Sequence, residues 1–168
     1  GEPLSARDLV SFCSLLLIAG NETTTNLLGN AFNAFFENPA QFDRVKRTND
    51  LGPVVEEVLR YDSPIQGILR LTNEQVKIGD AAIPPDAVVM ILFGSANRDE
   101  RRWENSEQFD VDRDPIDHLG FGSGIHLCLG AHLARLEATI AIDVLRARLA
   151  RIEPRAQPTR FGSCILRG

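Results

Sequence analysis

The chain has 168 residues, enough for one domain, and hydrophobic residues make up 43% of them, which is enough to form a core. Its formal net charge is -5 and no basic stripe is visible, so we expect no nucleic-acid partner. The longest apolar run, Leu15–Ala19, is too short to span a bilayer, which needs about 20 residues, so we expect no membrane association.

The cysteines and the opening residues indicate the cellular compartment. Cys13, Cys128 and Cys164 are far apart in the sequence and odd in number, and Cys13 lies in an apolar segment. A disulfide framework is therefore not expected, and a cytoplasmic location fits better. The opening sequence GEPLSARD has no basic region of the kind that begins a secretory signal peptide.

A long helix is predicted over residues 5–37. It begins at a Ser-x-x-Asp capping box and ends at Asn38-Pro39, an extended or turn dipeptide. Residues 9–19 are apolar almost all round, which predicts that this half of the helix is buried. The sequence AGNETTTN (19–26) then brings glycine and polar residues into the helix and predicts a local break.

Shorter elements follow, and they predict a fold that is mainly α with small β-sheets, an α+β class. Proline at a first helical position marks two helix starts, and aliphatic runs between turn residues indicate a small sheet. We expect the whole chain, 1–168, to be part of a single domain. Its remaining elements are a helix over 39–45, a helix over 53–61, a β region over 67–93, a meander over 95–120 and a helix over 131–151.

The loop FGSGIHLCLG (121–130) carries the chemically most informative cysteine. Glycines on both sides of Cys128 allow the backbone to approach another group closely, and the helix that begins just after it favours a thiolate. No second Cys or His lies at zinc spacing and no C-x-x-C occurs, which disfavours a zinc or thiol redox protein. A single axial thiolate is what haem iron takes in some haem proteins. The alternative is a buried structural cysteine.

Two further patterns carry weaker signals. In 19–26, Glu22 beside threonines could hold water and relay protons, or it could belong to a satisfied polar patch under another helix. Glu57 and Arg60 are three residues apart on a predicted helix and can pair. Arg113, in the meander, is of the type that could complete a network with them.

Taken together, these residues resemble the cytochrome P450 family of haem-thiolate monooxygenases. The family's signature F-x-x-G-x-H/R-x-C-x-G is met at its fixed positions by Phe121, Gly124, His126, Cys128 and Gly130. Its motif A/G-G-x-D/E-T-T/S is met by Ala19, Gly20, Glu22, Thr23 and Thr24. Its E-x-x-R and its meander arginine are met by Glu57, Arg60 and Arg113, and all four features occur in the family's order.

The resemblance implies a role for each matched residue. Cys128 would be the proximal ligand of the haem iron, Phe121 would pack beside the sulfur and the haem, and Gly124 and Gly130 would be cofactor-binding residues of the same loop. Glu22 and Thr23 would deliver protons to the oxygen that is reduced, and Gly20 would leave space for that oxygen. The other implied roles are haem propionate binding by Arg70 and His126, shaping of the cysteine loop by Glu57, Arg60 and Arg113, and substrate lining by Ile65–Leu69 and Phe161–Cys164.

The resemblance also implies an activity and its partners. The protein would bind haem b and insert one oxygen atom from O2 into a small, partly apolar organic substrate. Electrons would come ultimately from NAD(P)H through a ferredoxin or similar protein, for which His132 and Arg135 are candidate docking residues.

Other possibilities remain open. The family's domain is much longer, so we expect the chain to match its C-terminal portion, of the soluble bacterial type. A non-functional fragment or pseudogene product that does not hold haem stably is one alternative. Peroxide-driven or rearrangement chemistry is another, disfavoured because Glu22 and Thr23 are both present.

Overall fold

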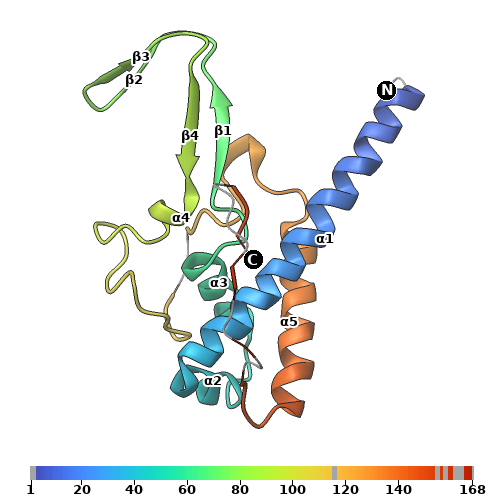
Figure 1. Ribbon diagram of the computed structural model, residues 1–168, viewed down its shortest axis with the longest axis vertical. Helices are drawn as coiled ribbons and strands as arrows, with labels where there is room; N and C mark the ends of the chain where they lie inside the picture. The colour runs from blue at the N-terminus through green and yellow to red at the C-terminus, as the bar shows by residue number, and fades with distance from the viewer. Residues whose placement is uncertain (1–2, 115–116, 154–155, 157–158, 161–164, 168) are drawn as a thin grey trace.

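The computed structural model describes residues 3–114, 117–153, 156, 159–160 and 165–167. Within these residues the helices are α1 (Ala6–Glu37), α2 (Pro39–Val45), α3 (Gly52–Tyr61), α4 (Phe93–Ala96) and α5 (Ala131–Arg148). The strands are β1 (Gly67–Leu71), β2 (Val76–Ile78), β3 (Ala81–Ile83) and β4 (Val88–Leu92). This is the α+β class expected from the sequence (Figure 1). No helix among the described residues is long and apolar enough to cross a membrane.

Helix α1 is continuous, so the predicted break in residues 19–26 is wrong. Its start is capped by Ser5, whose hydroxyl oxygen accepts a hydrogen bond from the Asp8 amide at 3.1 Å. The Thr23 hydroxyl donates to the Ala19 carbonyl at 2.6 Å, and the Thr25 hydroxyl donates back one turn in the same way. Thr23 and Thr25 thus satisfy their hydroxyls on the helix itself without opening it.

The first half of α1 is exposed, so the predicted burial of residues 9–19 is also wrong. Residues 6–22 are all exposed, and Leu17 and Ile18 keep 73% and 67% of their surface accessible. In Figure 1 this half extends away from the other helices. An apolar sequence shows that a helix can gain from a packing partner, but it does not supply one.

The core lies where the second half of α1 meets α2, α3 and α5. Phe35 of α1 is almost fully buried, and its ring centroid lies 5.4 Å from that of Phe42 and 5.9 Å from that of Phe109. Val55 and Ile142 bring α3 and α5 into the same cluster. Because Phe109 belongs to the meander, the core also fixes one point of that long segment.

The strands form two small antiparallel pairs. β1 pairs with β4, with Gly67 opposite Leu92, and β2 pairs with β3. Gly79, with a φ of 58°, makes the turn between β2 and β3. The chain end returns to this region, since Leu166 forms an isolated antiparallel bridge with Ile65. The predicted substrate-lining residues Phe161–Cys164 lie outside the described residues.

Two predicted boundaries need correction. Helix α5 ends at Arg148 rather than at 151, because Leu149 is extended and, like Ile152, packs against the core. The predicted β region ended at 93, but β4 stops at Leu92 and Phe93 begins the short helix α4.

Two glycines test this packing in opposite directions. A Cβ at Gly67 would lie 2.7 Å from the Ile91 carbonyl oxygen, whereas a Cβ at Gly29, inside α1, would meet nothing within 4 Å. Gly67→Ala should therefore lower the free energy of unfolding by about 1–3 kcal/mol, because β1 and β4 must separate. Gly29→Ala should raise it by about 1 kcal/mol through helix propensity. Denaturant unfolding measures both, and changes of the same sign would contradict the structure.

Candidate functional site

The cysteine loop forms a tight turn directly before α5. The Cys128 amide donates to the Phe121 carbonyl at 2.9 Å, which closes the loop on itself. Gly122 and Gly124 have φ values of 73° and 68°, a backbone region that side-chain-bearing residues rarely adopt. The Ala131 amide donates to the Cys128 carbonyl, so the sulfur lies next to the positive end of α5.

The surroundings of Cys128 fit a flat apolar cofactor with one protein ligand. Cys128 is exposed, and the loop presents Ile125 and Leu129, which keep 98% and 84% of their surface accessible. In the described part of the chain, no three His, Cys, Asp or Glu residues gather as a metal site would require. A lone thiolate beside apolar side chains therefore suits haem better than zinc.

The predicted propionate-binding residues lie on different elements. His126 is exposed in the short 3-10 turn Gly124–His126 of the cysteine loop. Arg70 lies on β1, and its Nη1 donates to the Leu69 carbonyl at 3.0 Å. Neither side chain forms an ion pair among the described residues, so the Arg70 guanidinium and the His126 ring are both available to an anion.

The predicted proton-delivery residues lie on the exposed half of α1. Glu22 helps line a shallow depression of about 390 Å³, together with Leu17 and Asn26 among others. Thr23 is half-buried, and a Cβ at Gly20 would meet nothing within 4 Å. The described residues show no hydrogen bond between this segment and the cysteine loop.

Helix α3 carries a buried ion pair. Arg60 Nε and Nη2 donate to the two carboxylate oxygens of Glu57 at 2.7 and 2.9 Å, and both side chains are fully buried. The remaining guanidinium donors reach three backbone carbonyls, those of Asn97, Ser106 and Gln108, at 2.8–3.0 Å. These carbonyls are spread along the meander, so the pair holds that segment in place.

Arg113 joins this network, as expected from the sequence. Its Nε lies 3.4 Å from the Glu57 carboxylate, and the Asp110 amide donates to the same carboxylate at 2.9 Å. Arg113 also donates to the Glu104 carbonyl at 2.6 Å. The structure therefore brings Glu57, Arg60 and Arg113 together, while their part in shaping the cysteine loop stays a prediction.

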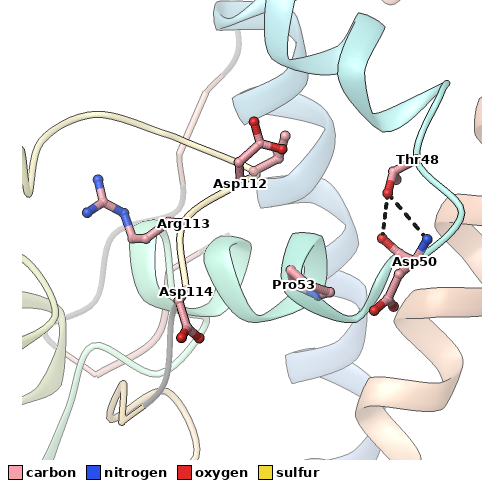
Figure 2. A pocket seen from close by; sticks show the side chains of 7 residues that line it. Thr48, Asp50, Pro53, Asp112, Arg113 and Asp114 are labelled. Carbon is pink, nitrogen blue, oxygen red and sulfur yellow. Dashed lines mark hydrogen bonds between the residues drawn. The ribbon is translucent and has the colours of Figure 1, made fainter.

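A separate hollow lies beside this network and is lined by none of the cysteine-loop residues. It has a volume of about 310 Å³ and is lined by Thr48, Asp50, Pro53, Val111, Asp112, Arg113 and Asp114. Figure 2 shows that Thr48 and Asp50 close one side through their own hydrogen bonds. Its lining combines acidic groups with Arg113, which is already bound to backbone carbonyls. We therefore assign this hollow no part in the cysteine site.

Comparison with known proteins decides the family. A sequence model described as Cytochrome P450 matches residues 51–147, more than half of the chain. The chain belongs to the cytochrome P450 family. Cytochrome P450 107B1 from Saccharopolyspora erythraea is 42% identical over 100% of this chain and 43% of its own length.

Solved P450 structures share the fold. The structure of cytochrome P450 CYP109Q5 from Chondromyces apiculatus matches with a TM-score of 0.93 and 49% identity, over 99% of this chain and 44% of that one. CYP109E1 from Bacillus megaterium, in complex with testosterone, matches with a TM-score of 0.94 and 41% identity, over 100% of this chain and 48% of that one. This P450 chain thus spans less than half the length of these relatives.

The sequence did not point to several residues that support the P450 cysteine loop. Asn97 is buried, and its side-chain Oδ1 accepts from the Leu119 amide at 2.7 Å while its own carbonyl accepts from Arg60. Glu56 and His118 are hydrogen-bonded to each other at 2.9 Å. Asn97 and Leu119 are 22 residues apart in the sequence, and Glu56 and His118 are 62 apart. No spacing rule links positions at these distances.

The buried pair on α3 can be tested by comparison with an exposed one. Arg60→Met leaves the Glu57 carboxylate buried without its main partner, which should lower the free energy of unfolding by about 3–5 kcal/mol. Arg101→Met is the matched control, because Arg101 pairs with Asp99 while 87% exposed, and it should leave unfolding unchanged within error. Denaturant titration of both variants gives the comparison, and equal losses would contradict the buried network.

Proposed function

We propose that the protein containing this chain is a haem-thiolate monooxygenase that uses O2. The reaction would place one oxygen atom in a small organic substrate and reduce the other to water, consuming two electrons and two protons. The observation that supports this best is Cys128, whose exposed sulfur lies in a glycine-rich loop at the start of α5. Membership in the P450 family adds to that support.

In this proposal the chain's own residues bind and orient haem b. Cys128 Sγ would be the iron ligand, and Ile125 and Leu129 would exclude water from the ligand side. Arg70 and His126 would bind the propionates through charge-assisted hydrogen bonds. When bound, the haem would supply the activation of O2, and electron donation from the thiolate favours cleavage of the O–O bond.

Glu22 and Thr23 would move the protons. Glu22 is exposed on α1, so its carboxylate can exchange protons with solvent. The Thr23 hydroxyl donates to the Ala19 carbonyl, and its oxygen keeps lone pairs that can accept a hydrogen bond, so the hydroxyl could take up one proton as it releases its own. The pair favours the O2-dependent reaction over the peroxide-driven or rearrangement alternatives.

The substrate would be small and partly apolar. Ile65–Leu69 enters β1, and of its aliphatic side chains Ile65 and Ile68 are half-buried and Leu69 is 48% exposed. The testosterone complex of CYP109E1 shows that a relative of similar fold accepts a largely apolar molecule. We extend to this protein only that class of substrate.

Electrons would come from NAD(P)H through a ferredoxin or similar protein in the cytoplasm. His132 is exposed on the first turn of α5, near Cys128, and is the freer of the two candidate docking residues. Arg135 is bound to Glu56, at 2.6 and 2.9 Å, and is therefore less free to change partners.

The absorption spectrum of the reduced, carbon-monoxide-bound protein tests the proposal. The full-length protein should show the red-shifted Soret band of thiolate ligation, and Cys128→Ser should lose it. Cys13→Ser is the matched control, since Cys13 is likewise a free, exposed cysteine, and it should keep the band. Bound haem without that band in the unaltered protein would overturn the assignment of Cys128.

The isolated 168-residue chain serves as a further arm of that experiment. The alternative that it does not hold haem is favoured by the exposure of Cys128 and of residues 6–22. Haem titration of this chain should then show weak, non-stoichiometric binding. Tight stoichiometric binding would show that these residues suffice for the site.

A further inference from the structure

Helix α3 presents two neighbouring glutamates to two different parts of the chain. Successive residues of an α-helix point about 100° apart. Glu57 points into the buried meander network, whereas Glu56 bonds His118 and Arg135, which lie before and after Cys128 in the sequence. Glu57 belongs to the E-x-x-R motif, whereas Glu56 belongs to none of the family motifs in the sequence.

The contact with His118 reaches the start of the cysteine loop. His118 Nε2 lies 2.9 Å from Glu56 Oε2, and His118 Nδ1 accepts a hydrogen bond from the Gly120 amide at 3.0 Å. Because Nδ1 accepts, a neutral imidazole must carry its hydrogen on Nε2 and donate it to Glu56. The His118 side chain is only 3% exposed, so this orientation is fixed.

The contact with Arg135 reaches the other side of the loop. Arg135 Nε and Nη2 donate to the two oxygens of Glu56 at 2.6 and 2.9 Å, a bidentate arrangement. The guanidinium carbon lies 4.6 Å from the centroid of the Phe121 ring. The His118 ring lies 6.1 Å from the same ring, so both partners of Glu56 contact Phe121.

Phe121 in turn holds the cysteine, because its carbonyl accepts the Cys128 amide at 2.9 Å. The backbone just before Phe121 packs closely against α3, since a Cβ at Gly120 would lie 3.0 Å from the Leu59 carbonyl oxygen. A chain of direct contacts thus runs from Glu56 through Arg135 and Phe121 to the backbone of Cys128.

Electrostatics keep this arrangement charged. Burial by itself would raise the pKa of Glu56, but the hydrogen bonds from Arg135 and His118 outweigh it and lower the pKa to about 2. The hydrogen bonds to the Glu56 carboxylate raise the pKa of Arg135. Glu56 and Arg135 therefore both stay charged at neutral pH.

We propose that Glu56 is a positioning residue for the thiolate ligand, holding the cysteine loop through Arg135 and His118. This proposal rests on the proposed haem-thiolate function. Glu56 does not touch the cofactor or the substrate in this scheme. It acts on the ligand as outer-shell partners act on metal-binding side chains.

Glu56→Gln in the full-length protein tests the proposal. Glutamine keeps the size of the side chain but has one acceptor oxygen and no charge, so it cannot hold both partners. The carbon-monoxide complex should lose its thiolate band about tenfold faster than the unaltered protein, the low end of outer-shell effects. The haem reduction potential should become more positive, because the variant removes a negative charge that is bonded to both partners of the loop.

Glu137→Gln on α5 is the matched control, since its exposed carboxylate forms no hydrogen bond or ion pair with the described residues. It should match the unaltered protein in both measurements. Arg135→Gln is the second variant, in case Glu56→Gln fails to fold, and it should also speed loss of the band. Glu56→Asp, which keeps the charge, should restore part of the lost band lifetime and most of the potential.

The possible outcomes separate this inference from the proposed function. If the unaltered protein shows no thiolate band, the haem-thiolate function fails and this inference fails with it. If the unaltered protein shows the band and Glu56→Gln or Arg135→Gln matches Glu137→Gln in lifetime and potential, only the role of Glu56 is overturned. Faster loss of the band with a positive shift of the potential supports it.

Discussion

The buried ion pair between Glu57 and Arg60 is the interaction on which the rest of this structure depends. Two charges placed in the core of α3 lose their hydration, and a buried pair is tolerated only when nearly every donor and acceptor finds a partner. Arg60 meets this demand fully, because its five N–H donors all make hydrogen bonds to Glu57 or to backbone carbonyls. The carbonyls of Asn97, Ser106 and Gln108 are thereby fixed relative to α3.

Short chains of hydrogen bonds connect the meander and α3 to the start of the cysteine loop. Asn97 gives its carbonyl to Arg60 and its side-chain oxygen to the Leu119 amide, two residues before Phe121. Glu56 holds the backbone at Gly120, since its partner His118 accepts a hydrogen bond from the Gly120 amide. A loop with two positive-φ glycines has little rigidity of its own. The contacts with α3 therefore support the prediction that this network shapes the loop that carries Cys128.

The sequence predicted what lies in local patterns. The signature around Cys128 and the E-x-x-R of α3 led to the cytochrome P450 family, which the family match and the fold confirm. The contact of Arg113 with Glu57 also followed from that pattern. These features are short, ordered along the chain and rich in residue types that few other sites require.

The sequence could not predict what depends on partners distant in the chain. Residues 9–19 are apolar, but their exposure depends on which elements pack against them, and the structure leaves all of them exposed. Asn97 is one polar residue among many in an aperiodic segment, and nothing local marks it as a link. Glu56 looks like an ordinary helix-surface carboxylate beside Glu57, and only the tertiary fold brings Arg135 and His118 to it.

Native-state amide hydrogen exchange tests the dependence of the loop on α3 most directly. The Asp110 amide donates to Glu57, and the Leu119 amide donates to the side chain of Asn97. Both acceptor residues are hydrogen-bonded to Arg60. Exchange of these two amides should therefore require the same opening free energy as the amide of buried Val58 in α3. Exchange of the Leu119 amide as fast as that of exposed Ser123, while Val58 stays protected, would show that the cysteine loop is shaped independently of α3.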